Sequence, residues 1–255
     1  MASGARPMAG RTGRRRGNEI VPGDDGDSGV AAERAATGTG LRERKKQRTF
    51  QAVSEAAIAL FLERGFDRVS VAEVAAAAEI SKPTLFRYFP AKEDLVLHRF
   101  ADHEDEAARV LAARPEELSA LAALRAHFLD GLDRRDPVTG LCDEPAVLAY
   151  MRLLYGTPAL VARLHAYVGR SEEALARALE GGASRVAGAA SAPAAVPVLG
   201  ARLAAGQIVA VQRILAMENW RRISSGESAA EVWPDAVEAA GTAFAQLGEG
   251  LRGYW

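Results

Sequence analysis

Residues 70–92 constrain the fold more than any other stretch of this chain. Two short patterns typical of helices, over residues 71–78 and 82–89, meet there at a tight turn. In the second pattern Leu85 and Phe89 are four residues apart, so they share one buried face of the helix. Basic, polar and aromatic side chains occupy its other positions. A short helix with such a front suits insertion into the major groove of DNA.

Capping residues mark the starts of both helices. Ser70 and Glu73 have the spacing of a capping box, in which each side chain bonds the backbone amide of the other residue. Ser81 is expected to cap the second helix, and Pro83 occupies its first turn, where a missing amide costs nothing. Local signals therefore predict both helices and the turn between them.

The run from residue 80 to residue 89, ISKPTLFRYF, followed by Lys92, Asp94 and Leu95, resembles the helix-turn-helix of the TetR family of transcriptional regulators. The resemblance covers roughly residues 45–100 and is faint beyond them. It implies an all-α protein, with an amino-terminal three-helix DNA-binding domain followed by a helical domain for ligand binding and dimerisation. The implied function is a sequence-specific DNA-binding transcriptional regulator, a dimeric repressor that a small molecule releases from an inverted-repeat operator.

Five residues of the second helix are expected to face the DNA bases. Lysine, threonine and arginine side chains offer hydrogen-bond donors, and an arginine can bond guanine through two donors at once. A phenylalanine ring can pack on a thymine methyl group, although many relatives carry tyrosine at this position. The candidate base contacts are Lys82, Pro83, Thr84, Phe86 and Arg87.

A second set of residues is expected to contact DNA phosphates. Some belong to the basic start of a long amphipathic helix over residues 41–64, and others flank the helix-turn-helix, where the resemblance implies backbone contacts. The candidate phosphate contacts are Arg44, Lys45, Lys46, Arg48, Thr49, Ser70, Ser81, Tyr88 and Lys92.

The distribution of charge agrees with a DNA-binding amino-terminal part. The chain of 255 residues has a net charge of −1. Residues 1–92 contain 16 lysines and arginines against 11 aspartates and glutamates, whereas the remainder contains 16 against 22. A basic part followed by an acidic part suggests two roles, the first of them near phosphate.

Cysteine content and hydropathy bear on the compartment. A single cysteine, Cys142, excludes an intrachain disulfide bond, which fits a reducing environment. No apolar run approaches the roughly 20 residues needed to cross a bilayer. We therefore expect a cytoplasmic protein without a membrane partner.

Three parts are expected along the chain. Residues 1–40, rich in glycine, alanine, arginine and aspartate, are predicted to be a disordered tail, with a DNA-binding arm as the alternative. Residues 41–91 are predicted to form the DNA-binding domain, and residues 92–255 the effector-binding and dimerisation domain. Within the latter, residues 92–113 are expected to form one linking helix whose tilt transmits the signal, and residues 183–197 a mobile linker.

The start of the linking helix lacks a good cap. Ala91 stands where many relatives have a polar residue, and an alanine side chain cannot accept a hydrogen bond. Glu93 and Asp94 compensate in part by interacting with the positive end of the helix dipole. The sequence therefore predicts a soft joint where the DNA-binding domain meets the linking helix.

From residue 115 onwards the pattern is helix after helix. A helical domain of this size can enclose a pocket between its helices, and the resemblance implies one for a small, often hydrophobic molecule of unknown identity. Polar and aromatic residues within the apolar patterns are the candidates for its lining. They are His127, Tyr150, Met151, Arg152, Tyr155, His165, Tyr167, Met217 and Trp220.

The last two helical patterns combine apolar stripes with small residues, which permit close contact between helices. The resemblance implies that this region forms a four-helix interface with a second copy of the chain. A homodimer would relate two DNA-reading helices by a two-fold axis, as an inverted repeat requires. The candidate interface residues are Leu203, Ile214, Trp233, Val237, Ala240, Phe244 and Leu247.

Other functions remain open at this point. The protein could be an activator or a ligand-independent regulator, or, in a different class, a helical partner-binding module without a role on DNA. An enzyme is disfavoured, because the sequence has no nucleophile–base pair, paired carboxylates, phosphate-binding loop or metal-ligand spacing. We therefore expect no cofactor and no metal. The expected partners are double-stranded DNA, a second copy of the chain and an unknown effector.

Overall fold

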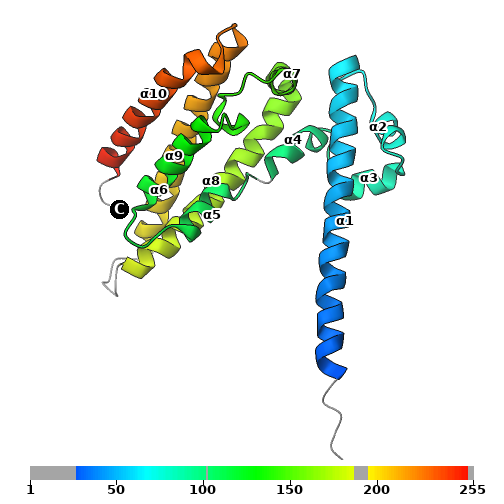
Figure 1. Cartoon of the computed structure of the whole chain (residues 1–255), viewed down its shortest axis with the longest axis horizontal. Helices are drawn as coiled ribbons and strands as arrows, with labels where there is room; N and C mark the ends of the chain where they lie inside the picture. The colour runs from blue at the N-terminus through cyan, green and yellow to red at the C-terminus, as the bar shows by residue number, and fades with distance from the viewer. Residues whose placement is uncertain (1–26, 102, 187–194, 252–255) are drawn as a thin grey trace, which may run out of the picture. The chain divides into compact units, whose positions relative to one another are not determined.

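The computed structural model describes residues 27–101, 103–186 and 195–251, with side chains over residues 46–100, 103–181 and 198–251. Within these ranges every regular element is a helix, which confirms the expected all-α fold (Figure 1). The elements are α1 (Asp27–Arg64), α2 (Val71–Ala77), α3 (Lys82–Tyr88), α4 (Asp94–Ala101), α5 (Glu106–Ala113), α6 (Ala120–Asp133), the 3-10 turn η1 (Pro137–Thr139), α7 (Pro145–Gly156), α8 (Pro158–Val186), α9 (Ala195–Ser224) and α10 (Ala229–Gly250).

Two compact units, residues 1–47 and 48–255, divide the chain, and α1 contributes to both. Within the first unit α1 begins at Asp27, whereas the sequence predicted a disordered tail as far as residue 40. The difference concerns residues 27–40, which include alanines, glutamate and arginine of high intrinsic helix propensity. The predicted arm in residues 1–26 lies outside the described residues.

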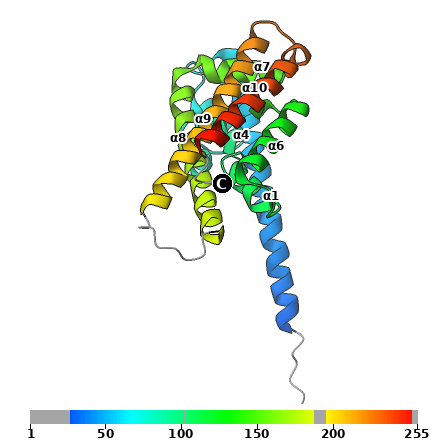
Figure 2. The same cartoon turned by 90° about the vertical axis from the view of Figure 1, so that its left-hand side faces the viewer.

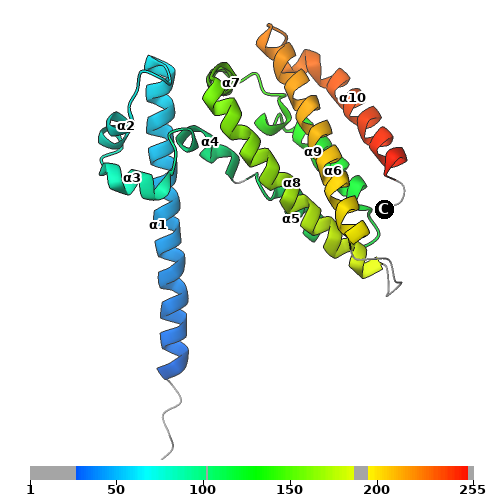
Figure 3. The ribbon, with the colours of Figure 1, turned by 180° about the vertical axis from the view of Figure 1, so that it is seen from behind.

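One hydrophobic core joins α1, α2 and α3 with α4, α7 and the start of α8. Val53, Ala57 and Phe61 of α1 are buried in it together with Leu85 and Phe89. The helices α2 and α3 lie beside the later part of α1, as Figure 3 shows. The apolar face predicted from the spacing of Leu85 and Phe89 is confirmed by their burial.

The predicted linking helix over residues 92–113 is two helices. Helix α4 ends at Ala101, residues 103–105 form a turn, and α5 begins at Glu106. Asp105 occupies the cap position of α5 without a capping bond from its side chain. Histidine and aspartate favour a helix interior only weakly, and this polar stretch makes contacts of its own that are described below. The prediction of one continuous helix is therefore wrong.

The start of α4 is held by a side chain further along the chain. The amide of Ala91 donates to Oδ2 of Asp94 at 3.0 Å, and Asp94 is only 5% exposed. Alanine does not cap this helix, as expected, but the amide of Ala91 is bonded. The hydrogen bond from Ala91 to Asp94 fixes the start of α4, which corrects the predicted soft joint.

A second core lies among the larger helices that follow. Helix α8 packs on α5 and α9, and α10 packs on α6 and α9; Figure 2 shows α9 and α10 side by side. The core includes Leu124 and Phe128 of α6, Ile208 of α9, and Ala240 and Phe244 of α10. The rings of Phe128 and Phe244 are 6.1 Å apart.

Several helix boundaries differ from the sequence prediction. Helix α6 begins at Ala120, where Ser119 caps it, instead of at residue 115. Of the predicted linker, residues 183–186 and 195–197 are helical, and residues 187–194 lie outside the described part of the chain. A capping box formed by Ser228 and Glu231 begins α10.

Within α9, the segment Val198–Ser224 is long and apolar enough to cross a membrane by length and composition, which the sequence analysis did not predict. Such a helix also occurs in the cores of globular proteins. Ala204, Ala205 and Ile208 of this segment are 0% exposed and belong to the second core. Part of its apolar character is thus explained by packing within the chain.

Candidate DNA-binding surface and ligand cavity

Helix α3 presents a basic and aromatic surface opposite its buried face. Leu85 is 0% exposed, whereas Lys82, Phe86 and Arg87 are exposed. Phe86 retains 42% of its surface, and Nζ of Lys82 lies 5.9 Å from the centre of its ring. These three predicted base contacts are therefore accessible on one short helix.

The first turn of α3 is fixed by its cap. Oγ of Ser81 accepts a hydrogen bond from the amide of Thr84 at 3.3 Å and lies 2.8 Å from the Thr84 hydroxyl. Pro83 is exposed in this turn, and Thr84 is half-buried. The cap predicted at Ser81 is confirmed, while base contacts by Pro83 and Thr84 stay predictions.

Tyr88 and Arg87 form a pair at the end of α3. The Tyr88 ring meets the ring of Phe50 edge-on at 4.8 Å, which anchors it on α1. The guanidinium of Arg87 lies 5.1 Å from the centre of the Tyr88 ring, and its Nη2 is 3.5 Å from the Tyr88 hydroxyl. The tyrosine thus orients an exposed cation without burying it.

The capping box of α2 is confirmed. The amide and the hydroxyl of Ser70 both donate to Oε2 of Glu73, at 2.7 and 2.8 Å. Oε1 of Glu73 accepts from Arg64 at 2.6 Å. The two bonds from Ser70, supported by Arg64, lower the pKa of Glu73 to about 2. Ser70 is therefore engaged as a cap, and its predicted phosphate contact would be additional.

Lys92 is partly used within the chain. Its ammonium group donates to the carbonyl oxygen of Phe66 and lies 4.3 Å from the centre of the Phe66 ring and 5.3 Å from that of Phe61. Because a lysine ammonium carries three donors, two remain for other acceptors such as a phosphate.

The remaining predicted phosphate contacts lie near the start of the second unit. Lys46 and Arg48 are exposed, and Thr49 is half-buried. The side chains of Arg44 and Lys45 lie outside the described residues. These contacts also stay predictions.

Two consecutive carbonyl groups of α4 connect it to two other helices. Ser54 of α1 donates to the carbonyl oxygen of Leu95 at 2.7 Å, and the hydroxyl of Tyr150 on α7 donates to that of Val96 at 2.9 Å. Burial raises the pKa of Tyr150 well above its usual value, so it stays a donor. A displacement of α4 would therefore act on both α1 and α7.

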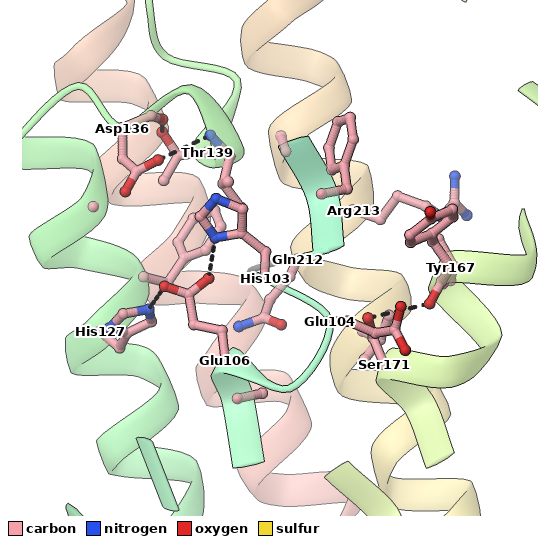
Figure 4. A pocket seen from close by; sticks show the side chains of 18 of the residues that line it. His103, Glu104, Glu106, His127, Asp136, Thr139, Tyr167, Ser171, Gln212 and Arg213 are labelled. Carbon is pink, nitrogen blue, oxygen red and sulfur yellow. Dashed lines mark hydrogen bonds and ion pairs between the residues drawn. The ribbon is translucent and has the colours of Figure 1, made fainter. Parts of the chain in front are cut away.

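A cavity of about 220 Å³ lies among the helices that follow α3. The end of α4, the turn before α5, and α5 to α9 all contribute to its wall. Its apolar lining includes Phe100, Leu124, Phe128, Leu164, Val168 and Val209. Its polar lining includes Arg134, Tyr155 and the residues labelled in Figure 4, which are His103, Glu104, Glu106, His127, Asp136, Thr139, Tyr167, Ser171, Gln212 and Arg213. A mostly apolar cavity with a few polar groups is typical of small-molecule sites.

Two histidines share one carboxylate in the cavity wall (Figure 4). Oε2 of Glu106 is 2.7 Å from Nδ1 of His103, and Oε1 is 3.1 Å from Nε2 of His127. These bonds lower the pKa of Glu106 far below its usual value, and the bond to Glu106 raises the pKa of His127. The cluster links the turn between α4 and α5 to α6.

Residues 54–98 match the family model described as bacterial regulatory proteins, tetR family. The match covers the end of α1, both short helices and most of α4, including the buried and exposed faces of α3. This segment of the chain is similar to the DNA-binding part of the TetR family. The matched segment thus contains the exposed face of α3 and the carbonyl groups of Leu95 and Val96, which connect α4 to α1 and α7.

Two curated relatives of this chain are named as transcriptional regulators. TcmR of Streptomyces glaucescens is 35% identical over 137 residues, which cover 53% of this chain and 59% of TcmR. MftR of Mycobacterium tuberculosis is 29% identical over 120 residues, which cover 44% of this chain and 61% of MftR. The chain therefore matches about three fifths of the length of these curated relatives.

Solved structures give a weaker comparison. NalD, described as the secondary repressor of the MexAB-OprM multidrug efflux pump in Pseudomonas aeruginosa, superposes with a TM-score of 0.46 at 17% identity. The superposition covers 77% of this chain and 97% of NalD. Agreement at this level carries no functional argument.

The cavity contains some of the predicted pocket residues and not others. His127, Tyr155 and Tyr167 line it. Tyr150 and Met151 instead belong to the core shared by α4 and α7, where they are 4% and 7% exposed. The sequence placed all five on apolar helical faces, but periodicity does not tell a core from a cavity.

The other four predicted pocket residues also lie outside the cavity lining. Arg152 and His165 are exposed, and His165 bonds the carbonyl of Val161 on its own helix at 2.8 Å. Trp220 is half-buried and packs on Tyr155 with ring centres 4.9 Å apart. Met217 is half-buried as well and does not line the cavity.

The predicted dimer residues also divide into exposed and buried ones. Leu203 and Ile214 of α9 are 55% and 58% exposed, and Trp233 of α10 is 40% exposed. The others are not on the surface: Ala240, Phe244 and Leu247 are buried in the second core, and Val237 is half-buried against it. The apolar stripe of α10 packs on α6 and α9 of its own chain, which corrects the prediction for these residues.

Sequence reasoning missed several cavity residues. Phe100, His103 and Glu106 were placed only within one continuous linking helix, and Gln212 and Arg213 were not singled out. The available signal was the concentration of acidic residues and histidine around residue 103, which is unusual in the middle of a helix. Their gathering around a cavity depends on tertiary packing, which this signal does not contain.

Proposed function

We propose that this protein is a sequence-specific DNA-binding regulator that acts in the cytoplasm as a homodimer on an inverted repeat. A small molecule bound in the cavity between α4 and α9 releases it from DNA. The observation that carries the proposal is the face of α3 on which Lys82, Phe86 and Arg87 are exposed above the buried Leu85. The family match over residues 54–98 and the names of the relatives support the same function.

The dimer is supported by the apolar surface of α9. Leu199, Leu203 and Ile214 are 58%, 55% and 58% exposed on this one helix. Several large apolar side chains on one exposed surface are a common mark of a protein interface. A two-fold dimer through α9 would give each protein molecule two copies of α3 for the two half-sites of an inverted repeat.

The route from cavity to DNA-binding surface runs through α4. Phe100 lines the cavity near the end of α4, and its ring stacks on that of Tyr150 at 6.3 Å. Tyr150 in turn holds the carbonyl of Val96, next to the carbonyl that Ser54 of α1 holds. A ligand that prefers one position of Phe100 would thereby shift the population of α4 positions and, with it, the placement of α3.

Footprinting of the purified full-length protein on genomic DNA tests the proposal, starting with the region upstream of its own gene and its neighbours. The expected result is a protected site with inverted symmetry, and affinity that falls steeply with salt because phosphate contacts release counterions. The genes beside the site would indicate candidate effectors, which should reduce protection. Absence of a protected site both there and across a genomic library would contradict the proposal.

A further inference from the structure

The carboxylates that line the cavity already form hydrogen bonds or ion pairs within the chain. Glu104 accepts from Nε of Arg170 at 2.8 Å, and Glu106 is shared by His103 and His127. Asp136 accepts from the amide of Val138 at 3.1 Å, and its carboxylate lies 3.9 Å from Arg134. No carboxylate in the described lining therefore requires a cationic ligand to balance it.

Arg213 on α9 is different. It lines the cavity and is exposed at its edge, and it forms no hydrogen bond or ion pair within the part of the chain that the structure describes. Figure 4 shows its side chain on the same side of the cavity as Tyr167. Its charge acts on the cavity wall, because burial raises the pKa of Tyr155 and the nearby Arg213 partly offsets that rise.

Gln212, the neighbour of Arg213, also faces the cavity (Figure 4). Its amide group forms no hydrogen bond with a described residue either. The half-buried amide and the unpaired guanidinium thus stand beside an apolar wall that includes Leu164, Val168 and Val209. An amide donor and a guanidinium are groups that recognise a carboxylate, a sulfonate or a phenolate.

We propose that the cavity binds an apolar organic anion, with its negative group on Arg213 and Gln212 and its hydrophobic body against Phe100, Phe128 and Leu164. This rests on the proposed function only in treating the cavity as the effector site. Among the described residues of the lining, Arg213 is the charged group without a partner in the chain, and the anion would supply one. A neutral ligand of the same shape would gain no ion pair with this exposed arginine, and a cationic one would lie beside a like charge.

Two fluorescent probes test the charge preference on the full-length protein. Anilinonaphthalene sulfonate carries an apolar ring system with one anion, and phenyl-naphthylamine has the same rings without the sulfonate. Binding of each is measured by fluorescence titration of the wild type, R213Q and R202Q. Arg202 is the control because it is an exposed arginine on the same helix that does not line the cavity.

The wild type should bind the sulfonate saturably and more tightly than the neutral probe. R213Q should weaken sulfonate binding by about tenfold or more, as expected for loss of a charged hydrogen bond, and change binding of the neutral probe by less than about threefold. R202Q should bind both probes as the wild type does. The melting temperatures of the three proteins show whether R213Q is folded.

Equal affinity of the wild type for both probes would overturn the proposal, and so would equal loss in R213Q and R202Q. If R213Q failed to fold, the comparison of the two probes on the wild type would still decide. The DNA-binding function is tested separately, by DNA binding of the wild type without any probe. Selective binding of the sulfonate by a protein that finds no DNA site would therefore contradict the proposed function and leave this inference standing.

Discussion

Both carboxylate oxygens of Asp94 accept hydrogen bonds from Arg163, although the two residues are 69 positions apart in the chain. Nε of Arg163 donates to Oδ1 at 2.8 Å and Nη2 to Oδ2 at 3.0 Å, and the same Oδ2 accepts from the amide of Ala91. The pair joins the first residue of α4 to α8. The start of α4, which follows the helix-turn-helix, is therefore fixed by the helix that also lines the cavity.

Replacing Arg163 by methionine should therefore weaken both stability and signalling. The buried Asp94 would keep only its backbone partner, and since the side chain of Arg163 is 39% exposed, we expect a loss of about 1–3 kcal/mol in unfolding free energy. Release from DNA by a bound effector should also become less complete. Denaturant unfolding and DNA titration measure the two effects. Arg177→Met, at an exposed position of the same helix, should do neither; an equal effect there would contradict this role for the pair.

Gly140 should not tolerate even a methyl group. It has a φ of 72°, and a Cβ atom there would lie 1.9 Å from the carbonyl oxygen of Ala216 on α9. Overpacking together with the left-handed backbone predicts that Gly140→Ala costs about 3 kcal/mol or more. Gly226→Ala is the control, because Gly226 also has a positive φ but open space around it, so about 1 kcal/mol is expected. Thermal unfolding that ranks the two variants equally would refute the close contact.

The carboxylate cluster predicts a pH dependence of stability. The folded protein raises the pKa of His127, so its contribution is complete below the ordinary value of 6.5 and is lost as pH rises through the raised pKa. It lowers the pKa of Glu106, whose contribution is present above 4.5 and is lost as pH falls through the lowered pKa. The cluster should therefore stabilise the fold most between these two values.

Replacement of His127 by glutamine should remove this dependence in part. The wild type should exceed His127→Gln in stability by at most about 1 kcal/mol near pH 5.5, since the cluster is partly exposed, and the difference should shrink towards pH 9. Melting temperatures across this range make the comparison. His165→Gln, outside the cavity, serves as the control, and a difference that grows with pH would contradict the assignment.

The proposed dimer can be broken on α9. Leu203→Glu would place a charge in the apolar contact of both copies, and the dimer dissociation constant should rise by about 30-fold or more. Leu118→Glu introduces the same charge at another exposed leucine, 37% exposed and outside α9. Sedimentation at micromolar concentration should show a dimer for the control and a monomer for Leu203→Glu. Two identical profiles would argue against an interface on this face.

Local signals were sufficient to predict the helix-turn-helix. The capping box at Ser70, the cap at Ser81 and the buried pair Leu85 and Phe89 each depend on residues within four positions of one another. Such local interactions can be recognised without knowledge of the rest of the fold. The prediction succeeded there because sequence spacing and physical contact nearly coincide.

The part of the chain from α4 onwards was less predictable, because the contacts that form its cores and its cavity join residues distant in sequence. The bond between Tyr150 and Val96 spans 54 positions, and the bond between His127 and Glu106 spans 21. Periodicity showed that α10 has an apolar face, but it could not show that α6 and α9 of the same chain cover Phe244. An apolar face does not show which surface covers it. The sequence therefore could not separate residues of the core from residues of the cavity or of a dimer interface.

The central claim is that the exposed face of α3 reads DNA sequence, and selection from a random DNA library tests it most directly. The wild type and Arg87→Ala would be selected in parallel at one salt concentration. We predict that the wild type enriches an inverted repeat, and that Arg87→Ala relaxes the preference at a symmetric pair of positions at a cost of about 1–3 kcal/mol. Identical enriched sequences for the two proteins, or no enriched sequence for the wild type, would contradict the claim.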